Sequence, residues 1–193
     1  RVEIGVQCLD DKVHDKLNRQ QSVDDVIKAT KLLKEAGLKV VYHMMPGLHG
    51  MTPETDLRDF KRLFEEEEFQ PDMLKLYPTL LVKGSPLSRN PGDFVPYDTE
   101  TAANLIASLK EIVPPYVRIQ RIQRDIPKPQ IIAGVMNSNL RQYARRELKA
   151  RGKKCRCINC RELWGAQIDP ETAELKEIEY KSSGATEYFI SYE

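Results

Sequence analysis

Three of the four cysteines in the chain, Cys155, Cys157 and Cys160, follow one another in the spacing CxCxxC. Thiolates at these positions can reach one soft cation from a tight loop, and zinc is the usual metal for such ligands. Basic neighbours favour the thiolate form and offset the charge of the site; they are Lys153, Lys154, Arg156 and Arg161. We therefore predict a zinc site at these three cysteines. A reduced cysteine run without metal is the less favoured alternative, because free cysteines rarely cluster in a basic loop.

Three sulfurs leave tetrahedral zinc one ligand short. The spacing does not choose the fourth ligand, which could be a carboxylate, a water, Cys8 or one of the three histidines, His14, His43 and His49.

Basic residues are concentrated just before and within the cysteine loop. A net charge of +1 hides this asymmetry, because residues 54–68 form an acidic stretch. Such a basic tract fits a polyanionic partner such as nucleic acid, and it fits an ordinary solvated helix face equally well. The tract consists of Arg141, Arg145, Arg146, Lys149, Arg151, Lys153, Lys154, Arg156 and Arg161.

The composition favours a cytoplasmic protein. Charged residues make up 31% of the 193 residues, and the chain has no apolar run near the ~20 residues of a membrane span and no start typical of a signal peptide. Clustered cysteines fit a reducing compartment and a metal site better than a disulfide framework. Because Arg1 leads directly into one strand pattern and Glu193 ends another, we expect a fragment of a longer protein.

Strand and helix patterns alternate over the first part of the chain, which predicts an α/β fold with a parallel sheet. Ser22, Thr52 and either Asp98 or Thr99 are expected to cap three intervening helices. The predicted strands are Val2–Gln7, Leu38–Met45, Met73–Tyr77 and Val117–Ile122.

Polar residues lie along these strands and near their carboxyl ends, where parallel sheets bind ligands. A lysine between strand-forming apolar residues, as Lys75 is, needs a carboxylate or a charged ligand facing it. His43 by itself is more typical of a hydrogen-bonded core residue than of a ligand. Strand alternation places Arg118 and Arg121 on opposite faces. Arg121 and Arg124 could bind phosphates or pair with acidic residues.

A basic helix is expected between Asn137 and Gly152, followed by the cysteine loop. The patterns of residues 174–181 and 186–192 then predict an antiparallel hairpin around the turn Ser182-Ser183-Gly184. This change of fold class places a domain boundary near residue 165.

Six ordered motifs resemble the catalytic subunit of Elongator across essentially the whole chain. They are EIGVQ at residue 3, LNR at 17, YHMMPGL at 42, PDMLKLYPT at 71, RIQRIQRDIP at 118 and CRCINCRE at 155. That family combines a radical S-adenosylmethionine (SAM) partial barrel with an acetyltransferase-like domain. Its members use acetyl-CoA and SAM to build a carboxymethyl-type group at carbon 5 of the wobble uridine of tRNA.

The resemblance implies three parts of the chain. Residues 1–136 would form the C-terminal part of a radical SAM (β/α) barrel, and residues 137–165 a basic helix with a zinc-binding linker. Residues 166–193 would begin an acetyltransferase-like α+β domain. The iron–sulfur cluster cysteines would precede Arg1 and the acetyl-CoA loop would follow Glu193, so we expect this polypeptide alone to lack the family's catalysis. The family pattern also changes at Cys8 and at Gln20-Gln21.

The resemblance also implies roles for individual residues. Gln7 and His43 would contact SAM, and Lys75 and Tyr77 would lie near the substrate pocket. Zinc in the linker would be structural. Other Elongator subunits or further copies of the chain are possible partners, and no membrane is expected. The tRNA anticodon arm would contact Arg121, Arg124, Arg141, Arg145, Arg146, Lys149, Arg151, Lys153, Lys154 and Arg156.

Two other functions remain open. The chain could be a zinc-containing RNA-binding module without catalysis, or a different barrel metalloenzyme whose cysteines hold iron.

Overall fold

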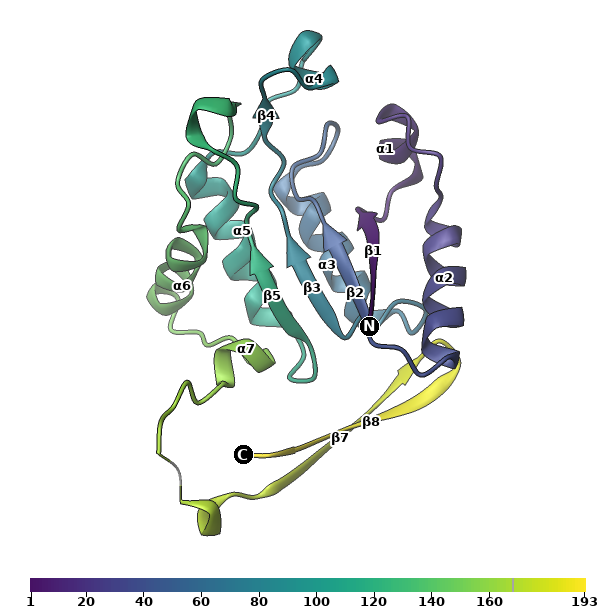
Figure 1. The fold of residues 1–193 in the computed structure, drawn as a ribbon, viewed down its shortest axis with the longest axis vertical. Coiled ribbons are helices and arrows are strands. Elements are labelled where there is room, and N and C mark those ends of the chain that lie inside the picture. Colours follow the sequence, from purple (N-terminus) through teal and green to yellow (C-terminus); the bar gives the residue numbers. More distant parts are fainter. Residues whose placement is uncertain (168) are drawn as a thin grey trace.

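The computed structural model describes residues 1–167 and 169–193 and contains a four-stranded parallel sheet (Figure 1). Its strands lie in the order β1-β2-β3-β5, so neighbours in space are also successive parallel strands along the chain. All four agree with the predicted strands to within two residues at either end. They are β1 (Val2–Gln7), β2 (Val40–Met44), β3 (Met73–Leu76) and β5 (Arg118–Ile122). The α/β class with a parallel sheet is confirmed.

Three long helices connect these strands: α2 (Val23–Glu35), α3 (Pro53–Glu65) and α5 (Thr99–Ile112). Ser22 and Thr52 form capping boxes, and the Asp98 side chain accepts a hydrogen bond from Thr101 N, as N-cap residues do. Short elements were not predicted, because they contain too few residues to show a period. These are α1 (Asp11–Lys16), β4 (Leu81–Val82), α4 (Pro86–Arg89), the 3-10 helix η1 (Lys128–Gln130) and β6 (Ile131–Ala133).

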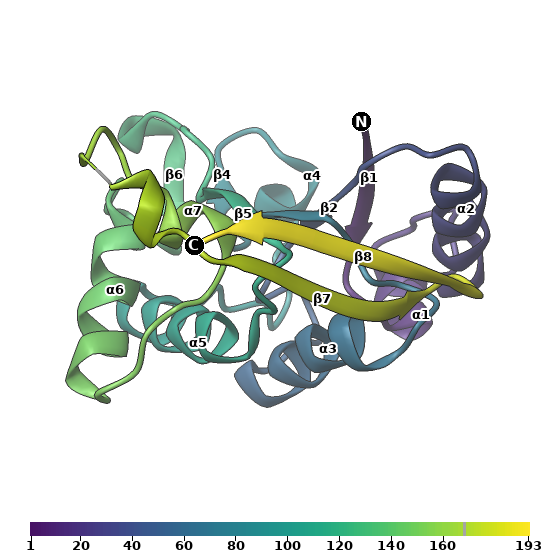
Figure 2. The same ribbon diagram turned by 90° about the horizontal axis from the view of Figure 1, so that it is seen from below.

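The three long helices pack on one face of the sheet and form the core there (Figures 1 and 2). Strand residues such as Tyr42 and Leu74 are fully buried against helix residues such as Phe60, Ile106 and Leu109. The other face of the sheet carries polar side chains from all four strands. We call it the open face.

One prediction about the open face was wrong. Arg118 and Arg121 line the same hollow, although their spacing predicted opposite faces. The cause is a register shift between β3 and β5: Leu74 pairs with Ile119, whereas Lys75 pairs with Arg121. Such an irregularity adds one residue to β5 and turns Arg121 to the face of Arg118.

The basic segment forms α6 (Leu140–Ala150), which packs along α5. The helix is shorter than predicted, because Asn139 is its N-cap and Gly152 takes the left-handed conformation at φ 66°. The cysteine loop follows, with a short helix α7 (Ile158–Arg161). Ile158 N donates to Val117 O, so this loop is fixed beside the residue that precedes β5.

The predicted hairpin is present as β7 (Leu175–Ser182) and β8 (Ala185–Tyr192), preceded by the 3-10 helix η2 (Pro170–Thr172). It crosses below the amino ends of the parallel strands (Figures 1 and 2). The ring of Tyr180 stacks on that of Tyr116 with centroids 3.8 Å apart. Lys34 Nζ lies 2.7 Å from Glu187 Oε1, and these contacts dock the hairpin on the sheet domain.

Helix α3 holds three segments near the carboxyl edge of the sheet through buried carboxylates. Asp56 Oδ2 accepts hydrogen bonds of 2.8 Å from Gly47 N and from Tyr97 Oη. One turn further on, Asp59 accepts 2.8 Å from Leu9 N. Burial raises the pKa of Asp56 to about 7 and also raises the pKa of Asp59.

In the described residues, no helix is both long and apolar enough to cross a membrane.

Replacing Asp56 by Asn should reduce the pH dependence of stability. Between the ordinary carboxyl pKa of about 4 and about 7, the unfolded chain has lost the proton that folded Asp56 retains. The free energy of unfolding of the native chain therefore falls as pH rises through this range, by about 1.4 kcal/mol per unit of pKa difference. Urea unfolding at about pH 5 and about pH 8 should show a smaller fall for Asp56→Asn. Asp125→Asn, at an exposed carboxylate, is the control, and an equal fall in all three proteins would contradict the assignment.

Candidate metal centre and nucleic-acid interface

The three clustered cysteines converge as a metal site requires. Their sulfur atoms all lie within 4.8 Å of one another. Cys157 is fully buried and is the N-cap residue of α7, whereas Cys155 is half-buried and Cys160 is exposed. Hydrogen bonds from Cys155 and Cys157, together with the nearby Lys110 ammonium, lower the pKa of Cys160. Hydrogen bonds with Cys157 and Cys160, together with burial, raise the pKa of Cys155. This donor set fits a thiolate-binding cation such as Zn²⁺.

The protein side chains considered for the fourth ligand lie elsewhere, so those candidates were wrong. His14 Nε2 contacts Val6 O at 3.2 Å, and His43 and His49 are bonded to Glu3 and Asp93. Cys8 is buried in a separate apolar cluster. Within the described residues, the three-cysteine group contains no fourth His, Cys, Asp or Glu. Of the candidates considered, a water remains for the fourth position.

The cysteine loop lies at the amino edge of the sheet, beside the start of β5. Ligands of parallel α/β sheets react at the opposite, carboxyl edge. A metal in this loop therefore fits a structural role, joining the loop to the sheet domain.

A charged cluster lies on the open face. Glu3 Oε2 is 2.6 Å from Lys75 Nζ and 2.7 Å from His43 Nε2. The expectation that a carboxylate or charged ligand faces Lys75 is thereby confirmed, and the hydrogen bond from Lys75 is the main cause of the lowered pKa of Glu3. Tyr77 packs edge-on against His43, with ring centroids 5.6 Å apart. His43 is thus a hydrogen-bonded residue of the open face and not of the core.

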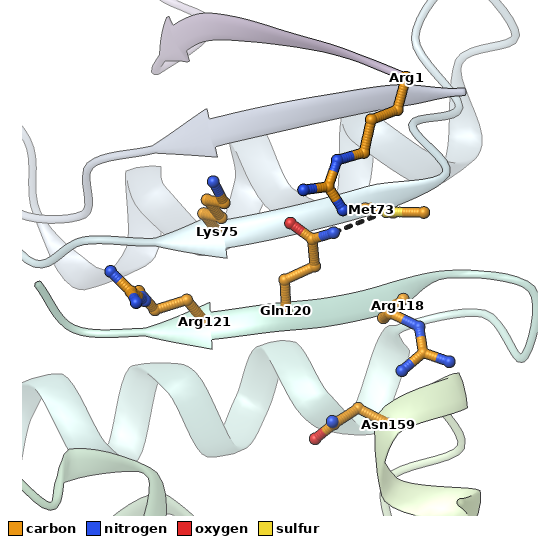
Figure 3. A pocket seen from close by; sticks show the side chains of 7 residues that line it. All are labelled: Arg1, Met73, Lys75, Arg118, Gln120, Arg121 and Asn159. Carbon is orange, nitrogen blue, oxygen red and sulfur yellow. Dashed lines mark hydrogen bonds between the residues drawn. The ribbon is translucent and has the colours of Figure 1, made fainter. Parts of the chain in front are cut away.

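Beside this cluster is a hollow of about 580 Å³. Gln120 reaches across it and donates to Met73 Sδ at 2.9 Å. Arg118 is paired with Glu162 at 2.6 Å, whereas Arg121 is largely exposed and 4.0 Å from exposed Asp125. The hollow is lined by Arg1, Met73, Lys75, Arg118, Gln120, Arg121 and Asn159 (Figure 3).

Lys75 and Arg121 are register neighbours on adjacent strands. Like charges in such positions repel each other. Glu3 compensates Lys75 closely, whereas exposed Asp125 is 4.0 Å from Arg121, so an anion bound in the hollow would relieve the repulsion.

Residues of the basic tract differ in whether hydrogen bonds hold their side chains. Arg141 donates to Asn159 Oδ1 and to the backbone of β5, and Arg151 donates to Ser108, Glu111 and Asn104, so both hold α6 in place. Arg146 lies over the Tyr143 ring at 4.7 Å. The other exposed cations are free to meet phosphates; they are Arg145, Arg146, Lys149, Lys153, Lys154 and Arg156 of the tract, together with Arg124 before it.

Two glutamines at the carboxyl edge have strained backbones. Gln7, at the end of β1, has φ 72°, and Gln123, just after β5, has φ 73°. Residues other than glycine rarely adopt this region, and such strain is concentrated at functional sites. The Oε1 atom of Gln123 is buried without a hydrogen-bond partner among the described atoms. Sequence reasoning missed Gln123, whose only signal was its place after the fourth strand.

Comparison with known proteins identifies the two parts of the sheet domain. Residues 1–63 match the radical SAM superfamily, and residues 71–150 match the radical SAM C-terminal domain.

Relatives of known function match the chain from end to end. It is 48% identical to a tRNA uridine(34) acetyltransferase of Dehalococcoides mccartyi, covering all of this chain and 43% of the relative. Elongator complex protein 3 of Saccharomyces cerevisiae is 40% identical, with coverage of 100% and 36%. The structure of Methanocaldococcus infernus Elp3 with an N-terminal deletion superposes with a TM-score of 0.95 at 44% identity, covering 100% of this chain and 47% of the other.

The chain thus spans less than half the length of these relatives. The chain is therefore homologous along its whole length to part of the tRNA uridine(34) acetyltransferases and Elongator complex proteins 3, and two of its regions match the radical SAM superfamily and the radical SAM C-terminal domain.

Proposed function

We propose that this chain is part of an enzyme that modifies the wobble uridine of tRNA, using acetyl-CoA and SAM to form a carboxymethyl-type group at carbon 5. The observation that carries the proposal is the 48% identity to a tRNA uridine(34) acetyltransferase over the whole chain. The sheet domain, the basic helix and the cysteine loop all fall within that similarity. The protein would act in the cytoplasm, and further Elongator subunits or copies of the chain remain candidate partners.

The domain organisation is part of this proposal. Residues 1–136 are assigned to the C-terminal part of a radical SAM partial barrel and residues 137–165 to the basic helix and zinc-binding linker. Residues 166–193 are assigned to the first strands of an acetyltransferase-like domain. The uncovered open face supports the first assignment, because a parallel sheet normally has both faces covered and a barrel encloses one of them.

The residues of the open face fit SAM and substrate contacts. Gln7 offers its amide from a strained position at the end of β1, and His43 lies on the same face beside Tyr77. Lys75 and Tyr77 are the substrate-pocket candidates. SAM with its iron–sulfur cluster supplies radical chemistry when bound. The cysteines of this chain do not fit the cluster, since three lie at the amino edge and Cys8 is buried among apolar residues. No residue here is assigned to acetyl-CoA.

In this proposal the exposed arginine and lysine side chains bind tRNA through its phosphates. Phosphate contacts position RNA without reading its sequence, and each one adds to the salt dependence of binding. The exposed residues Arg145 and Arg146 on α6 and Arg121 on the open face are best placed for these contacts. Arg141 and Arg151 contribute indirectly, since their side chains hold α6.

The double variant Arg145→Glu/Arg146→Glu should weaken tRNA binding by about tenfold or more and reduce the slope of log affinity against log salt by roughly one to two. The physical reason is the loss of two phosphate contacts and the gain of two negative charges. Affinities are measured by filter binding of a tRNA anticodon arm over a salt series. Lys28→Glu/Lys31→Glu makes the same charge change on exposed residues of α2 and serves as the control. Equal losses in both double variants would remove the specific role of α6.

Cys157→Ser should lower the zinc content from one ion per chain to nearly none and lower the thermal midpoint, because a structural site contributes its binding free energy to folding. Elemental analysis of aerobically and anaerobically purified protein gives the metal, and differential scanning calorimetry gives the midpoint. Cys8→Ser is the control and should retain zinc. Iron that disappears in Cys157→Ser would instead assign a redox centre to this loop.

A further inference from the structure

Lys110 is the most deeply buried cation near the cysteine loop. It lies in the last turn of α5, and only 2% of its surface is exposed. Burying an ammonium without compensation is strongly unfavourable, so a buried lysine requires an anionic partner.

The partner in this structure is a sulfur atom. Lys110 Nζ lies 3.2 Å from Cys160 Sγ. Across the described residues, no carboxylate lies within ion-pair distance of this ammonium; Glu111, the next residue along α5, is paired with Arg151. The residues that flank the cysteines are themselves basic. The negative charge that Lys110 faces is therefore that of the thiolates.

Lys110 is the buried cation beside the site that can offset its charge. Three thiolates and one divalent cation leave a net charge of −1, and one ammonium neutralises it. A neutral group of charges is far less costly to bury than a charged one. Since the described side chains provide no fourth anionic ligand, the ammonium of Lys110 would supply this balance when a divalent cation is bound.

We propose that Lys110 is a positioning residue of this metal centre: its ammonium donates a hydrogen bond to the metal-bound Cys160 thiolate and offsets the net negative charge of a three-thiolate site. The inference rests on the proposed zinc site. It also explains how the centre is joined to the core, because the preceding residue of α5, Leu109, is fully buried in the hydrophobic core. One side chain thus connects the metal loop to α5.

Three variants of the full chain separate the charge of Lys110 from its hydrogen bond. Lys110→Met removes both, Lys110→Gln retains a donor without charge, and Lys110→Arg retains charge and donors. Apparent zinc affinity is measured by competition with a chromophoric chelator. Loss of a partner that bonds a metal ligand lowers metal affinity by roughly 10- to 100-fold. We expect a loss of this size for Lys110→Met, a smaller loss for Lys110→Gln and near-native affinity for Lys110→Arg. Lys31→Met, at an exposed lysine of α2, should bind zinc as the native chain does.

A spectroscopic signature distinguishes this role from general support of the fold. In the Co²⁺-substituted chain, the thiolate-to-cobalt charge-transfer band should shift in Lys110→Met and Lys110→Gln and stay close to native in Lys110→Arg. Native affinity and an unchanged band in a folded Lys110→Met chain would overturn the proposal. If Lys110→Met does not fold, the proposal is overturned when Lys110→Gln, Lys110→Arg and the native chain have equal zinc affinities and equal charge-transfer bands. Absence of stoichiometric metal from the native chain would refute the metal site itself, which is a separate failure.

Discussion

Helices cover one face of the parallel sheet and leave the other face to polar side chains. The strands need the helix side for stability, because residues such as Tyr42 and Leu74 bury their side chains in the core on that side. On the opposite face Glu3, His43 and Lys75 satisfy one another through hydrogen bonds. This one-sided coverage is the constraint on which the sites depend, because it brings charged groups from strands far apart in the sequence onto one surface.

The two edges of the sheet have different tasks. At the carboxyl edge, buried Asp56 and Asp59 of α3 fix the loops that follow β2 and β1, and Gln7 and Gln123 take strained conformations. Such rigid support keeps ligand-binding groups in place. At the amino edge, the cysteine loop and the hairpin dock on the domain through Lys110, Tyr116 and Lys34. A metal held by the cysteine loop at the amino edge would leave the carboxyl edge free for chemistry.

Residues of the same type in one basic segment have different physical roles. Arg141 and Arg151 use their guanidinium groups for hydrogen bonds to β5, α7 and α5, and they hold α6 at both ends. Arg145 is exposed on the outer surface of the same helix, and Arg146 lies over the Tyr143 ring. Planar donors of arginine suit both tasks, so residue type does not distinguish a structural cation from one that binds phosphate.

The sequence by itself determined the local structure and the cluster of three cysteines. Alternating apolar patterns indicated the four strands, Ser22, Thr52 and Asp98 marked the helix starts, and the CxCxxC spacing brought Cys155, Cys157 and Cys160 together, because all of these depend on residues close in the chain. Only the tertiary structure decided that Arg121 shares a face with Arg118, that Glu3 faces Lys75, that the histidines lie away from the cysteines and that Lys110 lies beside Cys160. Each of these depends on strand register or on helix packing between distant segments, and a single shift in register moves a side chain to the other face of a sheet.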